Sequence, residues 1–179
     1  MQVVALPGRR IETEAWLKSL LAAAGIPKAD LIRYRHWDSD AEASIAFEAK
    51  RLEGQSPNLV VAKSFGTIVA ATAFCLHGFR PAAAVLIGTP YAAMDGSDLT
   101  FLQRFAAATE TLFIQQAQDP GGPAAALHTA LGVAAGTVES VPGDDHIYSD
   151  TTALAAIVQR RFAGRLNSAS DAAKPGSTP

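Results

Sequence analysis

The sequence predicts an α/β protein, a three-layer α/β/α sandwich built on a mostly parallel sheet of about six strands. Short apolar runs rich in β-branched residues alternate with longer stretches of helical periodicity, which indicates successive βαβ units. Some of the short runs, such as residues 83–87, are apolar at every position, as is typical of strands buried on both faces. Right-handed crossovers would then place helices on both faces of the sheet.

The predicted strands are bounded by turn residues. Residues 7–8 (Pro-Gly) stop the first strand, residues 88–90 (Gly-Thr-Pro) the fourth, and residues 117–122 the fifth. The alternating segment 31–37 is expected near a sheet edge. In chain order, the predicted strands are residues 3–6, 31–37, 59–61, 83–87, 111–116 and 137–141.

Helices are predicted between these strands from apolar spacing, capping residues and breakers. Gly25 ends the first helix, Asp38 or Ser39 is expected to cap the second, and Ser97 or Asp98 the fourth. In chain order, the predicted helices are residues 11–24, 40–52, 66–77, 99–108, 123–131 and 149–162.

The chain is predicted to fold as a single domain over residues 1–166. Its 179 residues, 49% of them hydrophobic and 18% charged, suit one core of ordinary size. Residues 167–179 are small and polar and include Pro and Gly, so they are predicted to form a disordered tail.

Charge and composition exclude several classes of function. The net charge of -2 provides no basic surface for nucleic acid. No apolar run reaches the ~18 residues of a membrane span, and the first residues lack the pattern of a signal peptide. Cys75 is the only cysteine, so no disulfide can form within the chain, which fits a reducing compartment. Together these features predict a cytoplasmic protein with no membrane partner. No spacing of His, Asp or Glu indicates a metal site, and no cofactor is expected.

Residues 59–70, LVVAKSFGTIVA, carry the most informative pattern. An apolar strand runs into a sharp turn with Ser64 at its tip and then into a helix, which suggests an exposed serine nucleophile. Gly66 leaves space for the helix to pack against the strand, and Phe65 would donate its backbone N–H to an oxyanion. Ala62 stands where the usual pattern has glycine. The alternative is a serine that only caps the helix.

Two other strand ends provide a candidate acid and a candidate base. Asp119 follows the fifth strand in an Asp-Pro-Gly-Gly sequence, which also favours an ordinary turn. His146 follows the last strand in a Gly-Asp-Asp-His sequence. Asp144 and Asp145 are rival acids, but residues adjacent to a histidine rarely reach its ring, so we expect them to hydrogen-bond within their loop. Serine, acid, then histidine is the chain order of one class of serine hydrolases.

With these motifs the chain resembles the α/β-hydrolase superfamily over about residues 3–162. The resemblance is carried by AKSFG at 62–66, QDPGG at 118–122 and GDDH at 143–146. It implies a minimal α/β-hydrolase fold without a lid, because only residues 91–109 separate the fourth and fifth strands. An open site of this kind suits small or surface-presented acyl groups better than long lipids.

The resemblance also implies the role of each site residue. Ser64 would be the nucleophile, His146 the general base and Asp119 the acid that orients it. The oxyanion would be held by the backbone N–H of Phe65 and by that of Arg9, or of the glycine before it, in the loop after the first strand.

Four residues near the strand ends are candidate substrate contacts: Gly8, Trp37, Lys63 and Tyr91. Lys63 stands directly before the serine, where a cation could attract an anionic substrate or stabilise an oxyanion. We expect instead that its side chain points away from the reacting atoms and packs or pairs elsewhere.

The leading interpretation is a serine hydrolase that cleaves a small-molecule carboxylic ester or thioester through an acyl-enzyme. An acceptor other than water would make it an acyltransferase. A catalytically silent protein of the same fold that binds a partner is the alternative. A doubly wound domain that binds a nucleotide or cofactor is less favoured, because no G-x-G-x-x-G sequence appears. The sequence does not indicate an oligomeric state.

Overall fold

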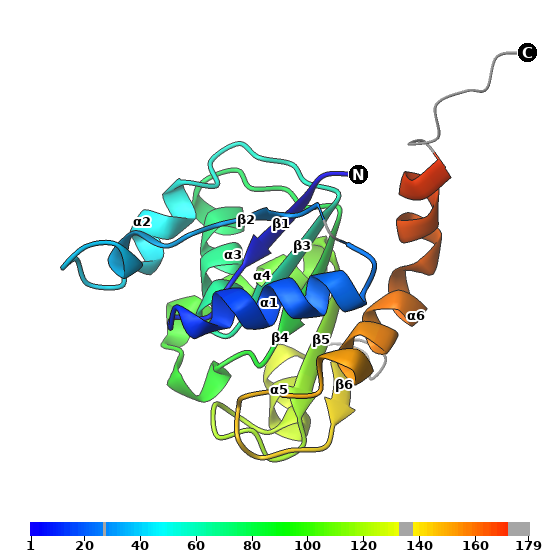
Figure 1. Cartoon of the computed structure of the whole chain (residues 1–179). Coiled ribbons are helices and arrows are strands. Elements are labelled where there is room, and N and C mark those ends of the chain that lie inside the picture. Colours follow the sequence, from blue (N-terminus) through cyan, green and yellow to red (C-terminus); the bar gives the residue numbers. More distant parts are fainter. Residues whose placement is uncertain (27, 133–137, 172–179) are drawn as a thin grey trace, which may run out of the picture.

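The computed structural model has one parallel sheet with helices on both faces (Figure 1). It describes residues 1–26, 28–132 and 138–171. The strand order is β2-β1-β3-β4-β5-β6, which confirms the predicted α/β/α sandwich with a six-stranded sheet. Every neighbouring pair of strands is parallel.

The strands are β1 (Val3–Leu6), β2 (Asp30–Leu31), β3 (Leu59–Lys63), β4 (Ala83–Ile87), β5 (Glu110–Gln116) and β6 (Val138–Val141). The helices are α1 (Glu12–Ala23), α2 (Ile45–Lys50), α3 (Phe65–Leu76), α4 (Gly96–Ala108), α5 (Ala124–Leu131) and α6 (Thr151–Asp171). Two short 3₁₀ helices, η1 (Arg35–Trp37) and η2 (Tyr91–Ala93), complete the described elements.

Alternation along the strands builds a separate core on each face of the sheet. Val3 and Ala5 of β1 pack into the core formed with α1 and α6. Val4 and Leu6 pack into the core formed with α2, α3, α4 and α5. Figure 1 shows α1 and α6 in front of the sheet and α3 and α4 behind it. The strands are therefore covered on both sides, as their apolar runs predicted.

The strand order also shows where a ligand would lie. The chain passes from β1 to β2 on one side of β1, and β3 then pairs with β1 on its other side. In open parallel sheets, ligands bind at the carboxyl ends of the strands, at the point where the order reverses. That point lies between β1 and β3, and β3 leads directly into Ser64.

Most of the segment 31–37, predicted to be one strand, does not pair with the sheet. Only Asp30–Leu31 pairs with β1, and residues 35–37 form η1. Between them, Tyr34 turns into the protein, where it is fully buried and donates its hydroxyl to the Pro7 carbonyl at 2.8 Å. The alternating pattern could not reveal that this aromatic ring is buried.

Two predicted helix starts are also wrong. The second helix begins at Ile45, because Ser44 rather than Asp38 or Ser39 accepts the Phe47 N–H. The Asp38 carboxylate is instead occupied by the Arg33 guanidinium, at 2.7 and 2.9 Å. The fourth helix begins at Gly96, where the Asp95 carboxylate accepts from two backbone N–H groups at 2.8 Å.

The last helix is longer than predicted. It reaches Asp171 and has a non-helical residue at Phe162, where the sequence predicted its end. Residues 167–171 of the predicted tail are therefore helical, and residues 172–179 lie outside the described residues.

Candidate active site

Ser64 lies on a strained turn between β3 and α3. Its backbone φ of 50° and ψ of -116° are unusual for a residue with a side chain. The turn is held at its start by the Ser64 N–H, which donates to the Ile87 carbonyl at 2.9 Å. It is held at its end by the Thr67 hydroxyl, which donates to the Ser64 carbonyl at 2.7 Å. The serine hydroxyl therefore sits at a fixed point above the sheet edge.

Gly66 is required by the packing of α3 against the loop after β1. A Cβ atom at this position would lie 2.6 Å from the Pro7 carbonyl oxygen and closer still to that of Leu6. Ala62, which stands where glycine is usual, is fully buried in β3.

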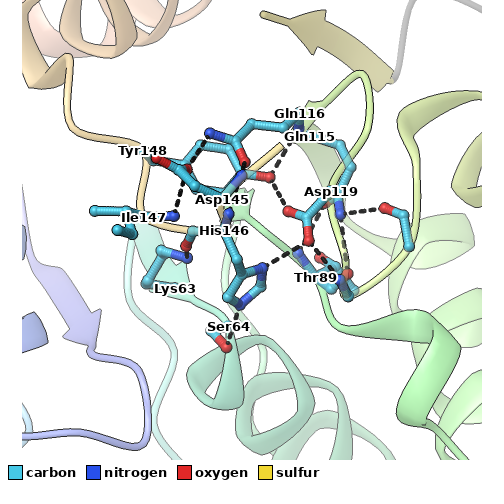
Figure 2. A network of polar contacts seen from close by, with 12 residues as sticks. Lys63, Ser64, Thr89, Gln115, Gln116, Asp119, Asp145, His146, Ile147 and Tyr148 are labelled. Carbon is cyan, nitrogen blue, oxygen red and sulfur yellow. Dashed lines mark hydrogen bonds and ion pairs between the residues drawn. The ribbon is translucent and has the colours of Figure 1, made fainter. Parts of the chain in front are cut away.

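The structure brings the predicted nucleophile, base and acid into one hydrogen-bonded chain (Figure 2). His146 Nε2 lies 2.9 Å from Ser64 Oγ, and His146 Nδ1 lies 2.7 Å from Asp119 Oδ1. A carboxylate can only accept, so Nδ1 donates to Asp119 and Nε2 of the neutral ring accepts the serine proton. Only 2% of Asp119 is exposed, and its carboxylate also accepts from the Gly121 N–H at 2.7 Å.

Gln116 and Tyr148 support this chain, and the sequence did not identify either. Gln116 Oε1 accepts from the His146 N–H at 2.8 Å, and its Nε2 donates to Asp145 Oδ1 at 2.8 Å. The Tyr148 hydroxyl donates to Asp119 Oδ2 at 2.5 Å and accepts from the Gln116 N–H at 2.8 Å. For Gln116, the sequence signal that could have been used is a pair of polar residues, Gln115 and Gln116, at the end of an otherwise apolar strand.

The loop that carries His146 is itself strained. His146 and Tyr148 have φ values of 60° and 63°, a region that side chains disfavour. Asp145 stays within the loop, where its carboxylate accepts from Gln116 and from the Ile147 N–H at 2.8 Å. The Gln116 hydrogen bond is the main reason that the pKa of Asp145 is lowered. Asp145 therefore bonds to Gln116 and to its own loop rather than to the imidazole. Asp144, the other rival acid, is exposed.

Lys63 is buried directly before the serine, with 3% of its surface exposed. Its Nζ donates to the His146 carbonyl at 2.9 Å and lies 4.5 Å from the centre of the Tyr148 ring. Burial lowers the pKa of Lys63 to about 8, although the charges of Asp119 and Asp145 oppose this shift. As expected, the amine does not bond to the serine hydroxyl or to the imidazole ring. Its partner is the backbone carbonyl of His146, the residue that carries the imidazole.

The pKa of His146 is lowered from its usual value. Burial is the largest cause, and the positive charge of Lys63 is the second. The hydrogen bond and charge of Asp119 act in the opposite direction. The net effect favours the neutral ring, which is the form that can accept a proton.

Aromatic side chains hold the loop after β1. The sequence predicted that this loop contains the second oxyanion donor. The Arg9 carbonyl accepts from His36 Nε2 and from Trp37 Nε1, both at 2.8 Å. The Tyr34 ring contacts the Phe65 ring edge-on, with 5.2 Å between centroids. These contacts connect the two segments that contain the predicted donors, Phe65 and Arg9.

A cavity of about 600 Å³ opens beside the serine and the histidine. Gly8 and Lys63, two of the four candidate substrate contacts, line it together with Trp16 of α1 and the exposed Ile147. The full lining is Gly8, Arg9, Arg10, Glu12, Thr13, Trp16, Lys63, Ser64, Asp145, His146 and Ile147.

The other two candidate substrate contacts lie elsewhere. Trp37 supports the Arg9 carbonyl, and Tyr91 packs against the loop at Gly122 and the core beside α3 and α4. Neither residue lines the cavity.

Within the described residues, no group of three or more His, Cys, Asp or Glu side chains is arranged to hold a metal ion. None of the helices in this part of the chain is both long and apolar enough to cross a bilayer.

Comparison with known proteins supports the fold alone. The chain matches no protein-family model and no curated protein. It is similar to the crystal structure of the ydeN gene product from B. subtilis, with a TM-score of 0.58. The two share 16% identity over 91% of this chain and 100% of that chain. At this identity the similarity shows a shared architecture and carries no activity from one protein to the other.

Proposed function

We propose that this protein is a serine hydrolase of the α/β-hydrolase type that cleaves a carboxylic ester or thioester. One observation carries the proposal: Ser64, on a strained strand-to-helix turn, is hydrogen-bonded to an imidazole that is itself hydrogen-bonded to a buried carboxylate. A serine used only as a helix cap would need neither partner, and its side chain makes no capping bond here.

In the proposed reaction, Ser64 Oγ attacks the acyl carbonyl while His146 Nε2 takes the hydroxyl proton. Asp119 holds Nδ1–H and stabilises the imidazolium that forms. The developing oxyanion would accept from the Phe65 N–H and from a second N–H in the loop at Gly8 and Arg9. His146 then returns the proton to the leaving alkoxide or thiolate, and a second cycle with water releases the acid.

The cavity offers apolar groups to an acyl chain. Trp16 and Ile147 line it beside the serine, and 61% of Ile147 is exposed. We propose that these apolar groups contact the acyl chain and that acetyl to butyryl esters react faster than long-chain esters. A panel of p-nitrophenyl esters tests this, and faster cleavage of the long-chain members would overturn it.

The decisive test is labelling with a fluorophosphonate, which reacts with activated serines. We expect one adduct, located on Ser64 by mass spectrometry and absent from Ser64→Ala. Ser97→Ala, which changes an exposed serine on α4, should label like the wild type. Absence of labelling in folded wild-type protein would rule out an activated nucleophile and favour a silent binding protein.

A further inference from the structure

Lys63 is a buried cation without a carboxylate bonded to it. Among the ion pairs of the described residues, none includes Lys63. Its Nζ instead meets the His146 carbonyl and the faces of two aromatic rings, Tyr148 at 4.5 Å and Trp16 at 5.8 Å. These partners satisfy a donor and attract a cation, but they do not neutralise its charge.

The position is costly for a lysine. Burial of an ammonium group disfavours its charged form, and the pKa of Lys63 falls to about 8 for this reason. An apolar side chain of similar length could fill the same space without that cost. Packing alone therefore does not explain why this residue precedes the serine.

The contacts of Lys63 join the nucleophile to the base. Lys63 is adjacent to Ser64 in the chain, at the end of β3, and its amine holds the carbonyl of His146, 83 positions away. Figure 2 shows the amine below the histidine loop, on the side of the serine. The loop is also held by Gln116 at its backbone N–H groups and by Trp16 at the Tyr148 carbonyl. Of these three supports, only Lys63 is on the strand that leads into the serine.

The charge of Lys63 also acts on the imidazole. Asp119 and Asp145 raise the proton affinity of His146, whereas Lys63 lowers it. The other ionisable groups nearby are Tyr148, which packs against the ring, and the cavity residues Arg9, Arg10 and Glu12. Lys63 is the buried cation in this set, so solvent screens it least.

We propose that Lys63 is a positioning residue for the base: its amine fixes the His146 loop relative to Ser64, and its charge keeps the imidazole neutral. Its effect on the reaction rests on the proposed function, whereas its effect on the protonation of His146 does not.

Two measurements on Lys63→Met test the proposal: the fluorophosphonate labelling rate against pH, and the His146 pKa from NMR of ¹³C-labelled imidazoles. The imidazole signal is assigned by its loss in His146→Gln. We expect the His146 pKa to rise by roughly one unit when the cation is removed. Relative to the wild type, the labelling rate of the variant should then fall further at acidic pH than at pH 8, where the ring is neutral in both proteins, with a limit of about tenfold below both His146 pKa values.

A merely structural role would lower the rate by the same factor at every pH. That result, or an unchanged or lower His146 pKa, would overturn the proposal. Lys63→Gln, also uncharged, should raise the His146 pKa in the same way and provides a second variant if Met is not tolerated. Lys50→Met, which removes an exposed lysine of α2, should leave both measurements as in the wild type.

The two proposals can fail separately. If folded wild-type protein is not labelled at Ser64, the proposed function fails. The NMR titrations of wild type and Lys63→Met would still show whether Lys63 controls the protonation of His146.

Discussion

Ser64 is approached from two sides by loops that are held in different ways. On the base side, the loops after β5 and β6 are fixed by a buried network that includes Asp119, Tyr148 and Lys63. On the other side, the loop after β1 is fixed by indole, imidazole and phenol donors to the carbonyls of Arg9 and Pro7. A carboxylate and an amine therefore take part on the base side, whereas the other side is supported by aromatic side chains, so changes on the base side should be larger and should depend more on pH.

The largest effect is expected at Asp119. In Asp119→Asn the amide no longer matches Nδ1–H as the carboxylate does, so the imidazole loses its orientation and the imidazolium its counter-charge. We expect the labelling rate and kcat/KM to fall by roughly 10³- to 10⁴-fold, the size of loss known for this substitution in a Ser-His-Asp triad. Rates are compared in proteins whose circular dichroism shows them to be folded.

Asp144→Asn is the matched control, because Asp144 is exposed in the same loop as His146. It should change the rate less than twofold. A loss comparable to that of Asp119→Asn would mean that the acid has been assigned to the wrong residue.

A smaller effect is expected at Gln116, which holds the loop but does not touch the ring. Gln116→Leu removes the acceptor for the His146 N–H and the donor to Asp145. We expect about 10- to 100-fold lower kcat/KM, because small displacements of a base are costly, and about 1–2 kcal/mol lower free energy of unfolding. Urea unfolding and ester hydrolysis measure the two losses, and the exposed neighbour Gln118→Leu should show neither.

On the other side of the serine we expect a weaker response that does not depend on pH. Trp37→Phe removes one of the two donors to the Arg9 carbonyl and leaves His36 in place. The rate should fall about two- to fivefold, the net value of one hydrogen bond, with an unchanged pH profile. If the rate of Trp37→Phe instead fell at a different acidic pH from that of the wild type, the two sides of the serine would not differ in their dependence on pH.

The buried amine of Lys63 should also make the free energy of unfolding depend on pH, and this can be measured without a substrate. The pKa of Lys63 is about 8 when folded and near 10.4 when unfolded, so the unfolded chain binds more protons between these values. The free energy of unfolding of wild type relative to Lys63→Met should therefore rise from pH 8 to 9.5, by on the order of 1–2 kcal/mol. A flat difference over this range would show that the folded lysine does not titrate there.

The sequence predicted the sheet and the candidate site residues because both depend on local signals. Apolar runs and breakers mark the strands, and parallel strands bring their carboxyl ends to one edge, so Ser64, Asp119 and His146 could be expected together. Tyr148 and Gln116 could not be predicted in their roles, since these depend on contacts across about 30 positions of the chain. Trp37 was predicted near the site, but whether it faces the cavity or supports a loop depends on packing.

The Trp16–Tyr148 hydrogen bond joins the first helix to the loop after the last strand, across 132 positions. The serine lies in the first half of the chain, whereas the imidazole arrives only after β6. During synthesis, a nascent chain would therefore present an inert serine until residue 146 has left the ribosome. A product truncated before residue 146 would have no esterase activity on the proposed mechanism, so fluorophosphonate labelling would also report that His146 has been synthesised and has folded into place.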